Sequence, residues 1–459
     1  MTRLACLTGL SIFYFSAEPI AAQSSNTPSL QDTLAKAADA NKDEELLALL
    51  EFINPFENAW LEMGDEDFAT YIAKPLAFDS SNEKSRSLVA WMYFLRATQN
   101  APAGSNHTME WMTWHTNSET FSKPDPTTTN ANITHKVLSK SARALGKKSQ
   151  IRSENEDCPK NFPPQAVTRN DIAFNYLNKD AKIWSKKKLT EYFEKKNSID
   201  MPVGSIGMKG IFIDPTCVDT VTPPLSQNAV SENVALKSGD PLTALYMTGL
   251  HIMAKLQPTP ENPFTSLDPS WFWTTFEYVN NPGLDNVHSM ISEPDALPPS
   301  VVEWFQNAAS KTGNEYLKNY TLSGTQVSFL TDSGGISVLG SSKLEDFAGG
   351  GINTFPNYKA PEQWTVFNAS CHACHSTAAF NPETQTFFVE SRQSFNNAFP
   401  LVIGELPPSI LDILKGAAES DDYENYDYKH LDFLWPITFQ FADIGSQENA
   451  TETETKKGE

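Results

Sequence analysis

Three residues toward the C-terminal end of this chain, Cys371, Cys374 and His375, form the pattern CxxCH within the stretch SCHACHSTAAF. When haem is attached covalently, two thiols add across the vinyl groups of the porphyrin and the adjoining histidine binds the iron. These residues must then lie on one short turn, which the spacing allows. The pattern predicts one covalent haem c on Cys371 and Cys374, with His375 as the proximal iron ligand through Nε2.

Two other kinds of site also use a CxxC pair. Zinc requires four ligands, and the available donors, Cys371, His372, Cys374 and His375, are crowded on five residues with no second CxxC or paired histidine elsewhere. A thiol–disulfide oxidoreductase places CxxC at a helix N-terminus after a strand, and the preceding stretch APEQWTVFNAS supports this only in part. Haem is therefore the favoured interpretation, with zinc and a redox dithiol as weaker alternatives.

The second axial position decides what such a haem can do. No methionine follows Met290, so the downstream methionine of a small cytochrome c domain is missing. His430 is the only histidine after the motif and is a candidate distal ligand. His251, Met253 and Met290 are upstream candidates. A fifth alternative, an open position, would allow peroxide, oxygen or small-gas chemistry.

The N-terminus predicts export. Arg3 is followed by an apolar run from Leu4 to Phe15 and by small residues up to Ala22, which is the layout of a cleavable signal peptide over residues 1–22. This run is too short to span a bilayer, and no other stretch is apolar over eighteen residues, so no transmembrane segment is expected in the mature chain. A periplasmic or secreted location follows, where Cys158 and Cys217 would form a disulfide or remain as two buried thiols.

The net charge indicates which classes of binding partner are disfavoured. The 459 residues carry a formal net charge of −21, which disfavours nucleic acid and anionic lipid as partners. Lys136–Lys196 holds fifteen basic against seven acidic residues, whereas Glu419–Glu459 holds eleven acidic against three basic ones. Both runs are either solvated surface or docking patches for an oppositely charged redox partner protein.

Periodicity predicts an α+β fold. Helices are expected at Leu30–Leu50, Glu83–Thr98 and Pro299–Tyr316, with a short amphipathic helix after Lys186–Lys188. Strands are expected at Met201–Asp214, Ala244–Leu256, Gly324–Leu330 and Ile336–Leu339. The expected organisation is a large, mixed, loop-rich body (23–345), a C-terminal, mainly helical cytochrome c-like haem segment (346–445) and a disordered acidic tail (446–459).

Aromatic residues gather in DPSWFWTTFEYVNNPG, which places Trp271, Trp273, Phe276 and Tyr278 within eight residues. They form either ordinary core or the wall of a haem pocket. Glu277 and His115 have no partner in the sequence that would indicate acid–base catalysis.

Several phrases resemble those of a poorly characterised family of bacterial exported cytochrome c proteins with a single C-terminal CxxCH. These are WMTWHTNSETF, GSIGMKGIF, MTGLHIMAKL, PSWFWTTFEYVNNPG and SCHACHSTA. The resemblance implies covalent haem on Cys371 and Cys374 and axial ligation by His375, and it implies no particular reaction.

Three functions fit these observations. The first is periplasmic electron transfer, for which 459 residues are more than one haem requires. The second is a haem enzyme or sensor with an open coordination position, or a haem that relays electrons from a separate pocket in residues 45–340. Length favours this second function, and the lack of catalytic motifs weakens it. The third is a binding protein whose haem is structural.

Overall fold

The computed structural model describes the sheet-bearing body of the chain and several short pieces nearer the C-terminus. The described residues are 60–79, 83–105, 107–123, 165–196, 198–213, 228–234, 243–259, 270–281, 284–289, 291–328, 337–342, 371–376, 378–387, 429–434 and 436–437. The predicted signal peptide, the helix expected at Leu30–Leu50, Cys158, Cys217 and the acidic tail lie outside the described residues.

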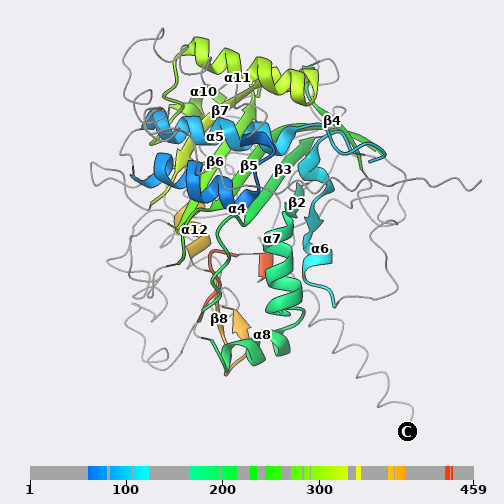
Figure 1. Ribbon diagram of the computed structural model, residues 1–459, viewed down its shortest axis with the longest axis vertical. Helices are drawn as coiled ribbons and strands as arrows, with labels where there is room; N and C mark the ends of the chain where they lie inside the picture. The colour runs from blue at the N-terminus through cyan, green and yellow to red at the C-terminus, as the bar shows by residue number, and fades with distance from the viewer. Residues whose placement is uncertain are drawn as a thin grey trace, which may run out of the picture.

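An antiparallel sheet of seven strands lies at the centre of the described structure (Figure 1). Its strands follow the order β1-β2-β3-β5-β6-β7, and β4 pairs with β5. They are β1 (His115–Thr116), β2 (Gln165–Arg169), β3 (Ile206–Ile213), β4 (Ser231–Val234), β5 (Thr243–Lys255), β6 (Trp271–Tyr278) and β7 (Tyr320–Gln326). A smaller antiparallel sheet has the order β10-β8-β9 and consists of β8 (Ala379–Asn381), β9 (Thr386–Phe387) and β10 (Lys429–His430).

The described helices are short apart from two. They are α4 (Asp65–Phe68), α5 (Glu83–Thr98), α6 (Asn117–Thr120), α7 (Asp171–Phe174), α8 (Lys186–Phe193), α10 (Leu284–His288), α11 (Pro299–Thr312) and α12 (Cys371–Ser376). Single π or 3-10 segments occur at Ala69–Ala73, Pro75–Asp79, Glu110–Thr113, Asn175–Asp180 and Glu315–Asn319. None of the helices in the described part of the chain has the length and apolar character that a membrane span requires.

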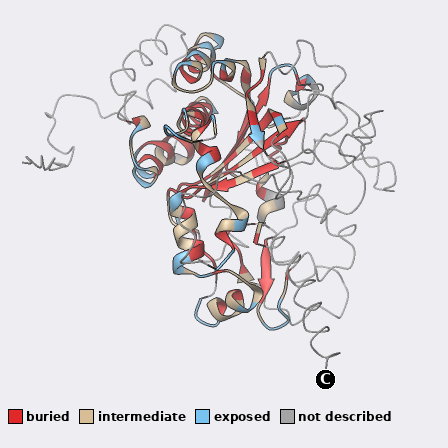
Figure 2. Cartoon of the chain, turned by 90° about the vertical axis from the view of Figure 1, so that its right-hand side faces the viewer, coloured by how far each residue is buried: buried red, intermediate tan, exposed pale blue. Residues whose placement is uncertain are grey.

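The two faces of the main sheet belong to two separate cores. Successive side chains of a strand point to opposite faces, so Phe272 and Phe276 of β6 lie on one face while Trp271 and Trp273 lie on the other. The first pair belongs to a large apolar cluster and the second pair to a smaller one. Both faces are covered, and strands β6 and β7 are accordingly buried almost throughout (Figure 2).

Helices α5 and α11 cover the face that carries Phe276. The ring of Trp91 on α5 lies edge-on to Phe276 at 4.9 Å and stacks on Phe305 of α11 at 5.7 Å between centroids. Its indole Nε1 donates to Asp295 Oδ2 at 3.0 Å, so the aromatic side chain is buried without leaving its one donor unpaired. The opposite face is covered by α7, α8, α12 and the smaller sheet, which occupy the lower half of Figure 1.

The phrases that carry the family resemblance are the central strands and the segments that contact them. GSIGMKGIF covers β3 except for Ile213, MTGLHIMAKL covers the second part of β5, and PSWFWTTFEYVNNPG contains β6. Gly204 has φ +84°, and a Cβ there would approach the Glu66 backbone to 2.6 Å. A Cβ on Gly210 would lie 2.5 Å from the ring of Trp111, so no larger residue fits between strand and indole.

The fold class predicted from the sequence is confirmed at the level of a mixed α and β chain with antiparallel sheets. The helix at Glu83–Thr98 is confirmed as α5, and the strands expected at Met201–Asp214 and Ala244–Leu256 are β3 and β5. The strand expected at Ile336–Leu339 is wrong over the residues described there, where Val338 N–H donates to the hydroxyl of Ser292 rather than to a neighbouring strand. Of the C-terminal segment 346–445, the described parts hold α12 and three short strands.

Candidate functional site

The CxxCH residues form the helix α12, which packs on the sheet face that carries Trp273. The His372 backbone N–H donates to Gln326 Oε1 of β7 at 2.9 Å, and Cys371 Sγ lies 3.6 Å from the carbonyl oxygen of Leu339. Cys371 also packs against the smaller apolar cluster. The motif therefore adopts the single helical turn that the spacing predicts. The side chain of Cys374 lies outside the described residues.

His375 has a fixed ring orientation and a defined tautomer. Its Nδ1 lies 2.8 Å from the carbonyl oxygen of Phe433. A carbonyl only accepts, so Nδ1 carries the proton and Nε2 keeps its lone pair. Enclosure by the protein lowers the pKa of His375 to about 4, against the raising effect of the Phe433 hydrogen bond, with the charge of Lys209 lowering it further. The ring is therefore neutral at pH 7, as an iron ligand must be.

Phe433 is held in place by its neighbour Asp432. The Asp432 carboxylate is fully buried and accepts from Lys255 Nζ at 2.8 and 2.9 Å and from Trp271 Nε1 at 2.9 Å. The backbone N–H of Met201 adds a bond of 2.6 Å. Asp432 and Phe433 have φ of +48° and +65°, a region that side chains disfavour. These contacts fix a strained turn, which directs the Phe433 carbonyl at His375.

His372 and His430 both contact the Phe433 ring, at 4.8 and 5.0 Å between centroids. Burial lowers the pKa of His372 to about 3, and the charges of His375 and His430 lower it further. His430 Nδ1 accepts the backbone N–H of Asp432 at 3.1 Å. In the neutral ring this leaves the proton on Nε2, so His430 in this arrangement does not offer the Nε2 lone pair that the distal-ligand prediction requires.

His251 lies in β5, on the same sheet face as Trp273. Its Nδ1 is 2.8 Å from Thr275 Oγ1 of β6, and its Nε2 is buried with no hydrogen-bond partner. Burial lowers the pKa of His251 to about 3, with further lowering by the charges of Lys209 and His375. His251 therefore lies within electrostatic range of His375, and both rings lie within range of Lys209.

The two methionine candidates for the distal ligand are less well supported than His251. Met253, the next residue on this face of β5, leans over Gly207, where its Sδ would lie 3.1 Å from an added Cβ. It packs against the smaller apolar cluster. Met290 lies outside the described residues.

Trp273 is the aromatic residue that contacts the motif. Its ring lies 4.6 Å from that of His375 between centroids, and its buried Nε1 has no hydrogen-bond partner. Trp271 binds Asp432, whereas Phe276 and Tyr278 belong to the core on the opposite face. The aromatic run thus contributes to both the motif surface and ordinary core.

Two residues that lacked partners in the sequence have them in the structure. His115 Nε2 lies 2.9 Å from Asp171 Oδ1. Glu277 is fully buried, and its carboxylate accepts from the hydroxyls of Ser323, Ser341 and Ser342 at 2.6 to 3.1 Å. The sequence shows neither set of contacts, because strand pairing and the 337–342 segment bring together residues that are far apart in the chain.

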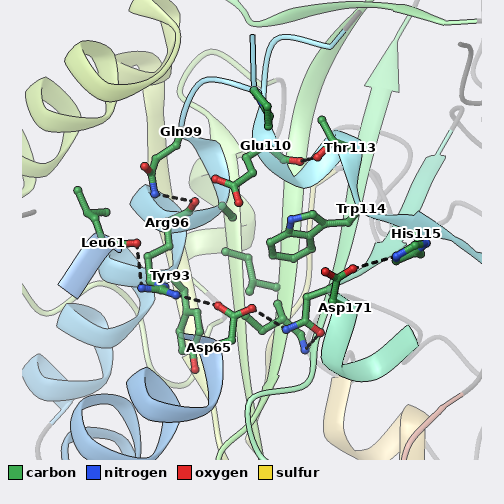
Figure 3. A pocket seen from close by; sticks show the side chains of 15 residues that line it. Leu61, Asp65, Tyr93, Arg96, Gln99, Glu110, Thr113, Trp114, His115 and Asp171 are labelled. Carbon is green, nitrogen blue, oxygen red and sulfur yellow. Dashed lines mark hydrogen bonds and ion pairs between the residues drawn. The ribbon is translucent and has the colours of Figure 1, made fainter. Parts of the chain in front are cut away.

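A polar cavity of about 330 Å³ lies on the other side of the sheet (Figure 3). Asp65 is at its centre, bonded to Arg96 at 2.8 Å and to Asn170 Nδ2 at 2.7 Å. Burial raises the pKa of Glu110, and repulsion by Asp65 adds to this effect. Trp114 and Thr113 line the same space. No motif in the sequence predicted this cavity, whose lining comes from several separate segments.

The cavity and the CxxCH helix are back to back across β5. Ile252 lines the cavity, and its neighbour in the chain, His251, points to the opposite face, toward α12. A ligand in the cavity and a haem on α12 would be separated by little more than the sheet.

The nitrogen donors on the α12 side have the chemistry of iron ligands. His375 presents Nε2 from the CxxCH turn, and the half-buried His251 has a buried Nε2 without a hydrogen-bond partner. An axially ligated iron needs two such nitrogens. Among the described residues, no group of three or more His, Cys, Asp or Glu side chains is arranged to hold a metal ion.

Comparisons of this chain with protein-family models, with curated proteins and with solved structures each found no match.

Proposed function

We propose that this chain is an exported c-type haem protein that transfers electrons in the periplasm. Cys371 and Cys374 would hold one haem through thioether bonds, and His375 would be its proximal ligand. The observation that carries the proposal is the hydrogen bond of 2.8 Å from His375 Nδ1 to the Phe433 carbonyl, which presents Nε2 from the CxxCH turn. The haem supplies reversible one-electron chemistry at its iron.

The residues around α12 would tune this chemistry. The Phe433 carbonyl increases the basicity of His375 and so favours the oxidised iron. Lys209 acts in the opposite direction, because a nearby positive charge favours the reduced state. It lies close enough to lower the pKa of both His251 and His375. Burial against Trp273 limits solvent access and thereby sets the potential further.

A redox partner protein with an acidic surface would dock on exposed lysines of this chain. Four lysines on and beside α8 are exposed, namely Lys182, Lys187, Lys195 and Lys196. Helix α8 is joined to the smaller sheet that follows α12, since Phe193 stacks on Phe380 and Lys186 Nζ lies 5.3 Å from the centre of the Phe387 ring. An acidic partner that bound these lysines would be close to the proposed haem.

The test is whether haem absorbance remains with the polypeptide after acid–acetone extraction. Purified protein from a host that matures cytochromes c is unfolded and extracted with acid and acetone, and its reduced-minus-oxidised spectrum is recorded in pyridine. We expect a c-type haem spectrum at one haem per chain, because thioether bonds resist extraction. Haem that leaves with the solvent would contradict the proposal.

A second candidate function is a haem that relays electrons from a substrate bound in the polar cavity. The observation that favours it is the position of the cavity directly behind His251. The variant Thr113→Trp would block the cavity at an exposed lining residue, and Ser118→Trp is an exposed control outside the lining. We expect a cavity substrate to reduce the ferric haem in the wild type and in Ser118→Trp but not in Thr113→Trp. Equal reduction rates in all three would remove this candidate.

A further inference from the structure

The sheet face beneath α12 carries a second histidine in register with the first. In the pairing of β5 with β6, Met253 is opposite Trp273 and His251 is opposite Thr275. His251 is therefore diagonal to Trp273, whose ring lies 4.6 Å from that of His375 between centroids. On the same face, Lys209 of the other neighbouring strand, β3, is directly opposite His251. The two histidines thus share one patch of the sheet surface although they are 124 positions apart in the chain.

The hydrogen bonds of His251 are those of a ligating histidine. Thr275 Oγ1 can accept from Nδ1, which leaves the lone pair on Nε2. An imidazole nitrogen that is buried without a hydrogen-bond partner is destabilising in an ordinary core. Nε2 of His251 is such an atom. A bond to a metal would remove the destabilisation.

The competing candidates lack one or more of these properties. His430 uses Nδ1 to accept the Asp432 N–H, so its Nε2 carries the proton. Ligation by His430 would require this bond to break within the turn that orients Phe433. The Met253 side chain is directed at Gly207 and packs in the apolar cluster.

We infer that His251 is the distal ligand of the haem iron, opposite His375, so that the protein has a bis-histidine centre. This inference rests on the proposed covalent haem. Two imidazoles give a six-coordinate, low-spin iron with no open position, which suits electron transfer and not the binding of peroxide or gases. Thr275 would be a positioning residue, since it holds Nδ1 of His251.

The test is the spin state of the haem in matched variants. We expect wild-type protein to be low-spin in both oxidation states and not to bind carbon monoxide. His251→Ala should be high-spin in the ferric state and should bind carbon monoxide, and added imidazole should restore the low-spin spectrum. His251→Met keeps a ligand of similar length, and it should stay low-spin with a raised potential. Thr275→Val should keep the ligand and shift the potential.

Two controls separate His251 from other histidines. His430→Ala removes the competing candidate, and His115→Ala removes a histidine on the cavity side of the sheet. Both should retain the wild-type spectrum. A low-spin spectrum in His251→Ala, or its loss in His430→Ala alone, would overturn the inference. Intact mass distinguishes this outcome from failure of the proposed function: every variant keeps the haem mass if only the ligand assignment is wrong, and the wild type lacks it if the haem proposal is wrong.

Discussion

Replacement of Asp432 with alanine is expected to lower the free energy of unfolding by about 3–5 kcal/mol, the usual cost of removing one partner of a buried ion pair. Lys255 and Asp432 are both fully buried, with Nζ and Oδ2 2.8 Å apart. Without the carboxylate, the buried Lys255 ammonium would be left with the half-exposed Asp200 carboxylate, at 3.4 Å, as its counter-ion, and Trp271 Nε1 would lose its acceptor. Urea unfolding of the haem-loaded protein measures the change.

Two further variants make this result specific. The double variant Asp432→Ala with Lys255→Met removes the buried ammonium as well and should recover part of the lost stability. Glu191→Ala breaks the exposed ion pair with Lys188 on α8, where solvent screens the charges, and it should leave the urea midpoint unchanged. If Asp432→Ala were no more destabilising than Glu191→Ala, the buried pair would not be the anchor of this segment.

Replacement of both Cys371 and Cys374 with serine is expected to abolish covalent haem attachment completely. Serine has no thiol to add to the porphyrin vinyl groups, while His375 and its hydrogen bond to the Phe433 carbonyl would remain. Any haem retained through the imidazole alone would leave on extraction. The measurement is the ratio of haem to protein after acid–acetone treatment.

Ser376→Ala is the matched control, because it changes a residue of the same helix without touching a proposed attachment point. This control should keep one haem per chain. Haem that remained bound to the serine double variant through extraction would show that the two cysteines are not the attachment points.

Much of the fold could be predicted because its signals are local. The helix at Glu83–Thr98 follows from a broad apolar face, and the alternation in Met201–Asp214 predicts β3. The run Trp271–Tyr278 was recognised only as aromatic, because a strand that is buried on both faces has no polar alternation. Its aromatic residues serve two different cores, and periodicity in one strand does not assign either face to a partner.

The candidate site could be predicted only where it is contiguous in the chain. CxxCH identifies Cys371, Cys374 and His375, but the acceptor of His375 is a backbone carbonyl 58 residues later. A turn in the left-handed region at Asp432 and Phe433 directs that carbonyl. Asp tolerates this region but Phe disfavours it, so the pair of residues does not predict the turn. Likewise, His251 was one of several upstream candidates until the β5–β6 register paired it with Thr275.

The mass of the intact mature protein tests the central claim most directly. The protein is expressed in a host that matures cytochromes c, unfolded to release any loosely bound molecule, and weighed against the mass of its sequence without residues 1–22. We predict an excess equal to one haem, which is absent when Cys371 and Cys374 are both replaced with serine. A colourless wild-type protein of unmodified mass would contradict the account.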